Sequence, residues 1–370
     1  TVIETARVQV AELIGAQPRD VIFTSCATES NNAAIHAALK ANPGKRHIVT
    51  SAVEHSSVLN YCMALEGNHG WRGLHGLAGS TAPLPGPADT LSHRMGEGRG
   101  EGIRVTYLPV DRDGLLKLAD LENAITDETA VVSLMWANNE TGVLFPVKEI
   151  AGICRARGVL YHCDAVQAAG KVEMNVSRDG GLRADYLSLA GHKFHAAKGV
   201  GALYVRRKAP FSPLIHGGHQ ERNLRGGTEN VALIVGMGKA AELARKHLPD
   251  YEKKVRPLRD TLEEGILNSI PNTELNGHRL QRLANTTNIT FHGIESEALL
   301  ILLDQEGICA SSGSACLADS DEPSHVVKAM KPESAASRQM IRFSLGPANT
   351  VAEVKAALNA IERAVRMLRS

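Results

Sequence analysis

The chain has 370 residues, more than a single hydrophobic core usually holds, so we expect two domains. Its 41 basic and 40 acidic residues give a net charge of +1, which argues against a nucleic acid or an anionic membrane as partner. No stretch reaches the roughly 20 apolar residues needed to span a bilayer.

The six cysteines show none of the paired spacings that cluster metal ligands, so we expect no intrinsic metal site. A set of free thiols fits a reducing compartment better than a disulfide framework, which predicts a cytoplasmic protein.

Short apolar runs alternate with amphipathic stretches along the first half of the chain. The runs are VIFTS, HIVTS, AVVSLMW, VLYHCD and DYLSLAG, and the stretches include NNAAIHAALKA, SSVLNYCMALE and VKEIAGICRARG. This alternation predicts an α/β fold with a mostly parallel sheet flanked by helices. Ligands of such sheets bind at the carboxyl ends of the strands, where polar residues follow each run.

Two features interrupt or end this pattern. Residues 67–102 are rich in Gly, Pro, His and Ser and have no hydrophobic period, which predicts a mobile insertion. A helix expected from Val231 to about His247 leads to a second region with its own helix and strand signals, including TTNITF and QMIRFSLG. We therefore predict a large domain over 1–248 and a smaller α/β domain over 249–370.

The segment SLAGHKF places Lys193 directly after an apolar strand. Alone, such a lysine is more simply a solvated loop residue. Asp164 and Gln167 follow the strand VLYHCD, and an aspartate there could hold a pyridinium nitrogen protonated. The alternative for Asp164 is capping of the segment AVQAAGK.

Three further segments carry polar groups after strands. FTSCATESNNAA could present the amides of Ala27 and Thr28 to a phosphate at a helix N-terminus, although ordinary capping by Thr28 or Ser30 is an equal alternative. His55 could stack on an aromatic ring and move protons. Asn139 could bind a phenolic oxygen or a substrate, or simply form a turn.

The last constellation is ICASSGSACLADSDEPSHV, in which Cys316 lies among small and polar residues. A cysteine on such a loop suggests a used thiolate, whereas most cysteines are buried and inert. Arg342, at the end of the run MIRFSLG, could bind a substrate carboxylate with two hydrogen bonds, or make a surface ion pair.

Taken together, these segments resemble the cysteine desulfurases of the NifS/IscS group, in the class V aminotransferase superfamily of pyridoxal-phosphate enzymes of fold type I. The resemblance covers nearly the whole chain. It rests on ATES, VEH, ANNETG, HCDAVQ, AGHK, HGGHQERNLRGGTEN, SSGSAC with EPSHV, and IRFSLG, in that order.

The resemblance implies that Lys193 binds pyridoxal 5'-phosphate covalently, that Asp164 pairs with its ring nitrogen and that His55 stacks over the ring and handles thiol protons. The other cofactor contacts that it implies are Ala27, Thr28, Asn139, Gln167, Ala190, Gly191, His192 and, from the other subunit of a homodimer, Thr228. Ala190 stands where some relatives have a serine, so only a backbone contact is expected there.

The resemblance also implies a reaction. L-Cysteine, held by Arg342 and Asn139, gives L-alanine and a persulfide on Cys316 in the loop 310–325, for transfer to an iron–sulfur scaffold or another acceptor. Cys316 could also serve as a transient iron–sulfur ligand. ANNETG, HCDAVQ and GTEN favour the nitrogen-fixation type over the housekeeping type.

Two alternatives stay open: a selenocysteine lyase-like enzyme of the same fold, and a catalytically impaired sulfur-relay or scaffold-binding protein. The second arises because the family pattern begins with an LDNNATT-like segment that we do not find ahead of Thr1.

Overall fold

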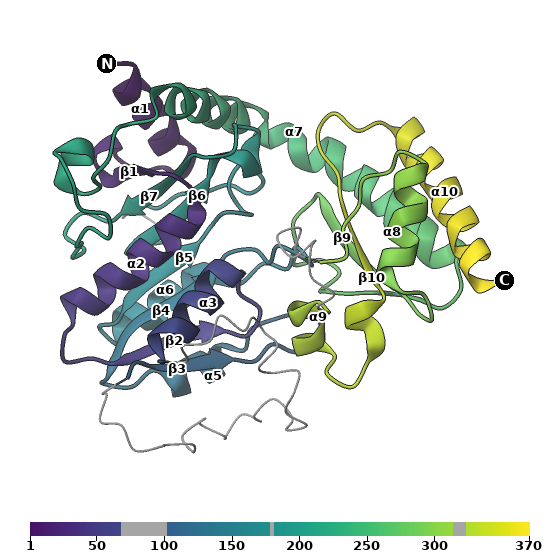
Figure 1. Cartoon of the computed structure of the whole chain (residues 1–370), viewed down its shortest axis with the longest axis horizontal. Coiled ribbons are helices and arrows are strands. Elements are labelled where there is room, and N and C mark those ends of the chain that lie inside the picture. The colour runs from purple at the N-terminus through teal and green to yellow at the C-terminus, as the bar shows by residue number, and fades with distance from the viewer. Residues whose placement is uncertain (68–101, 178–180, 314–322) are drawn as a thin grey trace.

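The computed structural model describes residues 1–67, 102–177, 181–313 and 323–370. It has two parts, each built on a β-sheet, with one long helix passing from the first to the second (Figure 1). The predicted insertion 67–102 lies almost wholly outside the described residues, and Cys316 lies outside them too.

The large sheet has seven strands and confirms the predicted, mostly parallel arrangement. Among the described residues, β7 runs antiparallel to both of its neighbours, β1 and β6, and the other strands of this sheet all point the same way. The spatial order is β1 (Val21–Thr24), β7 (Gly201–Val205), β6 (Tyr186–Ala190), β5 (Leu160–Asp164), β4 (Thr129–Met135), β2 (His47–Ser51) and β3 (Arg104–Leu108).

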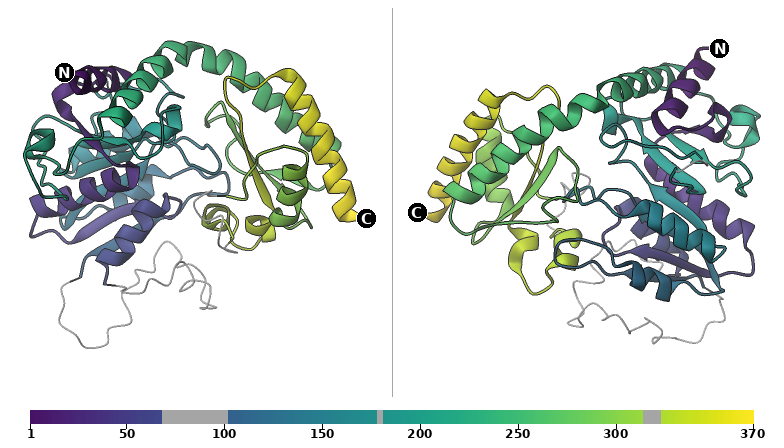
Figure 2. Two further views of the ribbon diagram at one scale, coloured as in Figure 1. Left: turned by 45° about the horizontal axis from the view of Figure 1, so that its top comes forward. Right: turned by 180° about the vertical axis from the view of Figure 1, so that it is seen from behind.

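Helices cover both faces of this sheet because the central strands are apolar on both sides. Ile48 and Val131 pack with the helices on one face, while their neighbours Val49 and Val132 belong to the core on the other. Figures 1 and 2 show α2 (Ala27–Ala41) and α3 (Ser56–Leu65) over the first face and α5 (Leu118–Ala124) and α6 (Val147–Ala156) over the second; α1 (Val2–Ile14) packs on α7.

The second part confirms the smaller α/β unit expected near the C-terminus. Its antiparallel sheet has the order β10 (Met340–Ser344), β9 (Thr286–Phe291), β8 (Thr273–Leu275). Helices α8 (Ser296–Gln305) and α10 (Val351–Arg369) share its hydrophobic core, and the short α9 (His325–Met330) lies toward the large sheet. No helix in the described ranges is long and apolar enough to cross a membrane.

The long helix α7 (Val231–Ser269) corrects the expectation of a helix that ends before its first proline. It continues through Pro249 and Pro257. A proline removes one backbone hydrogen bond from a helix interior, but here both ends are packed: Met237 is buried in the large core and Val255 in the small one. The domain boundary predicted at 248/249 falls inside this helix and stays a prediction.

A loop after β4 makes a second connection between the two parts. Val143 pairs with Arg282 in an antiparallel bridge, and backbone hydrogen bonds join Leu144 to Gln281 and Leu283 to Gly142. The loop over residues 138–144 therefore lies against the small sheet and brings the end of β4 next to it.

Candidate active site

Three neighbouring strands end at one edge of the large sheet. Met135 of β4 pairs in register with Asp164 of β5, and the amide of Trp136 donates to the Asp164 carbonyl. β6 ends beside them at Ala190 and continues directly into the turn η2 (Gly191–Phe194), which carries Lys193. The predicted residues Asp164 and Lys193 therefore follow adjacent strands at the same edge.

The N-terminus of α2 lies against the same edge. Thr24 and Ala190 both pair with Gly201, and a Cβ on Gly201 would lie 2.7 Å from the Cys26 carbonyl carbon, so a glycine is required there. Cys26 is the N-cap and makes no side-chain hydrogen bond to the first turn. The alternative of capping by Thr28 or Ser30 is therefore wrong, and the first amides of α2 have no cap among the described side chains.

An ion pair ties the segment RGGTEN to this helix end. Arg225 donates from Nε and Nη2 to the two carboxylate oxygens of Glu29, at 2.9 and 3.0 Å. The pair offsets the Glu29 charge, which would otherwise oppose an anion at the helix end. Thr228 follows three residues later and is exposed.

Asp164 is buried, and both its carboxylate oxygens accept hydrogen bonds. Oδ1 accepts from the Val166 amide at 3.0 Å, which is the local turn bond that the capping alternative expected. Oδ2 accepts from Nδ2 of Asn31 at 2.8 Å. Asn31 did not appear among the predicted residues, although its position one turn after Ala27 and Thr28 on α2 was a usable signal.

His55 is the N-cap of α3, and its Nδ1 accepts from the Ser57 amide at 3.1 Å. The Ser57 hydroxyl lies 2.8 Å from the same nitrogen and also 2.8 Å from Nδ2 of Asn31. A continuous set of hydrogen bonds thus links His55 to Asp164, and Ser57 is a second residue that the sequence did not single out.

The buried ammonium group of Lys171 holds two site segments together. Its Nζ donates to the carbonyl oxygens of Gln167 and Lys193, both at 3.1 Å. Burial, and then the charge of Lys193, lower the pKa of Lys171 to about 7. His192 is exposed, and its pKa is lowered by partial burial and then by the charge of Lys193. The turn that carries Lys193 is therefore fixed to the turn after Asp164.

Asn139, in the loop after β4, and Arg342, on β10, come together. Nη1 of Arg342 donates to the Asn139 carbonyl at 2.7 Å. The buried Oδ1 of Asn139 has no hydrogen-bond partner among the described residues. It is Asn138 whose Oδ1 accepts from the amides of Glu140 and Thr141. The turn-forming asparagine is thus Asn138, and the Asn139 side chain remains available to a ligand.

The residues on either side of the Cys316 segment meet at one buried carboxylate. Oε2 of Glu140 accepts from the Ser324 hydroxyl at 2.5 Å, and the same oxygen would lie 3.4 Å from a Cβ on Gly313. Arg342 also exchanges two backbone hydrogen bonds with Ser311. Both flanks of the segment therefore start beside Asn139 and Arg342.

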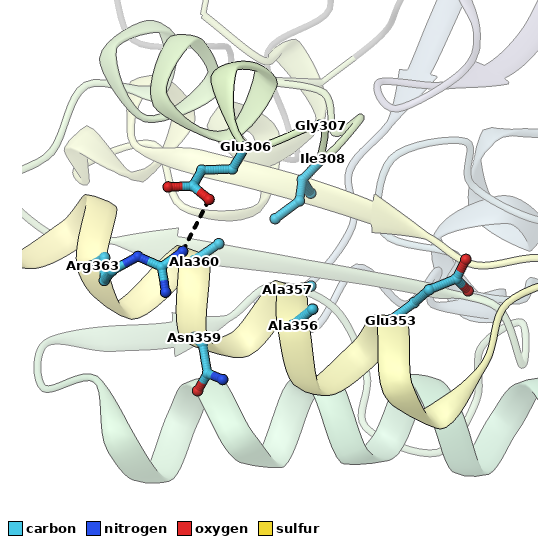
Figure 3. Close-up of a pocket in the computed structure, with 9 residues that line it drawn as sticks. All are labelled: Glu306, Gly307, Ile308, Glu353, Ala356, Ala357, Asn359, Ala360 and Arg363. Carbon is cyan, nitrogen blue, oxygen red and sulfur yellow. Dashed lines mark hydrogen bonds and ion pairs between the residues drawn. The ribbon is translucent and has the colours of Figure 1, made fainter.

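A cavity of about 390 Å³ elsewhere on the small part takes no share in this site. It lies between the end of α8 and the helix α10, where Arg363 and Glu306 form an exposed ion pair at 2.9 Å (Figure 3). None of the predicted site residues lines it.

The arrangement fits an aromatic, phosphorylated cofactor that forms a bond to lysine. It offers an uncapped helix N-terminus for a phosphate, a buried carboxylate for a ring nitrogen, an amide oxygen without a donor among the described residues, and a lysine in the turn after the adjacent strand β6. Among the described residues, no group of three or more His, Cys, Asp or Glu could hold a metal ion.

Comparison with known proteins points the same way. The family model described as aminotransferase class-V matches residues 1–72 and 97–357. Cysteine desulfurase 2 of Trichormus variabilis is 48% identical over 100% of this chain and 83% of its own length, and cysteine desulfurase NifS of Azotobacter vinelandii is 43% identical with the same coverage. A solved NifS-like protein has a TM-score of 0.82 and 34% identity over 99% of this chain and 88% of its own.

The chain belongs to the aminotransferase class-V family, with the pyridoxal-phosphate-dependent fold type I. Within it, the chain is a cysteine desulfurase, and its cofactor is pyridoxal 5'-phosphate.

A buried carboxyl beside the site leads to a prediction about stability. Glu54 accepts from the Ser51 hydroxyl and the Met135 amide through Oε1, and burial raises its pKa to about 8. In the unfolded chain it ionises near 4.5. The folded protein thus holds the extra proton between these values, so this group makes stability fall as pH rises from about 4.5 to 8.

We therefore expect Glu54→Gln to raise the free energy of unfolding at pH 7 by roughly 2–4 kcal/mol and to leave it nearly unchanged at pH 4. Urea unfolding of both proteins at several pH values measures the difference. Parallel pH profiles for the two proteins would contradict the prediction.

Proposed function

We propose that the described edge of the large sheet binds the cofactor with the residue roles expected from the resemblance. The observation that carries this proposal is the placement of Asp164 and Lys193 after adjacent strands, with the Lys171 ammonium joining their turns. Asp164 pairs with the ring nitrogen, His55 stacks on the ring, and Gln167 and Asn139 flank the phenolic oxygen.

The phosphate lies at the start of α2, with Ala27, Thr28, Ala190, Gly191 and His192 around it. Thr228 is exposed and held near this helix by the Arg225–Glu29 pair, which supports the proposal that it reaches the phosphate of a second subunit in a homodimer. The bound cofactor supplies an electron sink for the bonds of the substrate α-carbon.

The chain's own residues do the remaining work. Arg342 binds the carboxylate of L-cysteine, and its hydrogen bond to the Asn139 carbonyl supports this assignment. Lys193, once replaced by the substrate amine, takes the α-proton. Cys316 attacks the substrate sulfur as a thiolate. One C–S bond breaks and one S–S bond forms. The proton of the Cys316 thiol is balanced by the hydrogen gained at the methyl carbon of alanine, so no outside oxidant or reductant is needed.

Both flanks of the Cys316 segment begin at Glu140, which supports this role for Cys316. Cys316 is three positions after Gly313, and three residues span roughly 10 Å at most. The persulfide then passes to an iron–sulfur scaffold or another acceptor. The nitrogen-fixation pathway and the cytoplasmic location stay predictions.

Purified protein incubated with pyridoxal phosphate and L-cysteine tests the function. We expect equal amounts of alanine and of sulfur, the latter recovered as persulfide on the protein or, after addition of a thiol reductant, as sulfide. Release of pyruvate and ammonia instead of alanine would contradict it.

Arg342→Ala should raise the KM for L-cysteine by roughly 10- to 100-fold and change kcat less, because hydrogen bonds to a charged group contribute to binding. Steady-state alanine release measures both constants. Arg338→Ala, at an exposed position just before the same strand, is the matched control. An unchanged KM in Arg342→Ala would remove this residue from the substrate site.

A further inference from the structure

Four residues from three elements form one hydrogen-bonded chain at the site. Nδ2 of Asn31 on α2 lies 2.8 Å from Oδ2 of Asp164 and 2.8 Å from Oγ of Ser57, and Oγ of Ser57 lies 2.8 Å from Nδ1 of His55. Asn31 is fully buried, and Asp164 and Ser57 are 6% and 8% exposed. Water therefore has little access to these bonds.

The chemistry of the groups fixes the direction of each bond. An amide nitrogen carries two hydrogens, which matches the two acceptors of Asn31, whereas its oxygen turned toward Asp164 would face a carboxylate. The Ser57 oxygen thus accepts from Asn31, so its own hydrogen points to His55. The Ser57 amide donates to the same ring nitrogen at 3.1 Å. Nδ1 of His55 faces two donors and carries no proton.

We propose that Asn31 and Ser57 are positioning residues that hold His55 as the tautomer protonated at Nε2 and hold the Asp164 carboxylate in place. This inference rests on the proposed roles of His55 and Asp164. His55 then presents a hydrogen-bond donor, not an acceptor, from Nε2. A proton added at Nδ1 would face the Ser57 amide and break the cap of α3. The expected role of His55 in handling thiol protons stays a prediction.

The Asn31→Asp variant reverses the direction of the hydrogen bonds between Asn31, Ser57 and His55. An ionised aspartate cannot donate to Asp164, and it attracts the Ser57 hydroxyl away from His55. We expect a larger population of His55 protonated at Nδ1, and a dissociation constant for pyridoxal phosphate raised by roughly 10- to 100-fold through the repulsion of the two carboxylates. Ser57→Ala removes the hydroxyl donor and keeps the backbone amide donor, so it should shift the tautomer in the same direction by a smaller amount.

Nitrogen-15 NMR of His55 in the full chain, with and without pyridoxal phosphate, reads the tautomer directly, and absorbance titration gives the dissociation constant. Ser56→Ala, one residue away on α3, is the matched control and should change neither quantity. A neutral His55 protonated at Nδ1 in the wild type would overturn the proposal. So would an unchanged tautomer in both Asn31→Asp and Ser57→Ala, and the serine variant alone decides if the other does not fold.

The tautomer of His55 and the proposed function can be contradicted separately. The tautomer is measured on cofactor-free protein, so it can contradict the chain of hydrogen bonds while the wild type still releases alanine. Conversely, a wild type that forms no alanine but shows the Nε2-protonated ring would support the chain of hydrogen bonds and contradict the proposed function.

Discussion

Lys193→Ala should lower alanine release by roughly 10²- to 10⁴-fold or more, because the variant loses the group proposed to take the substrate proton and to hold the cofactor through a covalent bond. The fold should survive this change. Lys171 contacts the carbonyl of residue 193, not its side chain, and that carbonyl remains in alanine. Loss of activity with an unchanged melting temperature would therefore show that the variant lost a catalytic group and not its fold.

Alanine release, cofactor absorbance and thermal unfolding of this variant are measured together. Lys198→Ala, at an exposed position five residues later, is the matched control and should keep all three wild-type values. Alanine release within a few-fold of wild type by Lys193→Ala would contradict the assignment of this lysine.

Cys316→Ser should lower the rate of persulfide and sulfide formation by roughly 10³-fold or more, because a serine hydroxyl is far less nucleophilic than a thiolate at neutral pH. Cofactor binding should not change, since the groups proposed to hold the cofactor come from other segments. Mass spectrometry of the protein after L-cysteine, with a sulfide assay, measures the effect.

The matched control for this second experiment is Cys309→Ser. Cys309 is exposed and precedes the same segment, so it is the competing acceptor thiol. Persulfide retained in Cys316→Ser and lost in Cys309→Ser would move the acceptor role from the first cysteine to the second.

The sequence was sufficient for the elements whose information is local. Polar residues after apolar runs located Asp164 and Lys193, because parallel strands bring their carboxyl ends to one edge whatever the rest of the chain does. The mostly parallel sheet was predicted from the alternation of apolar runs with amphipathic stretches. The residue roles came from the resemblance and are tested by the variants above.

The sequence could not give the contacts that depend on packing between distant residues. Asn31 meets Asp164 across 133 positions, and Arg342 meets Asn139 across 203. The continuation of α7 through Pro249 was missed for a similar reason. Local propensity favours a break at proline, whereas burial of the helix in two cores favours its continuation.

The same helix has a mechanical consequence. Arg342 belongs to the small sheet, Lys193 lies in the turn that follows β6 of the large sheet, and α7 is packed into the cores of both parts. Each proline removes an N–H from the ladder of helix hydrogen bonds, so bending is easiest near Pro249 and Pro257. The separation between Arg342, proposed to bind the substrate, and Lys193, proposed to bind the cofactor, therefore depends on the curvature of this helix together with the contacts of the loop over residues 138–144.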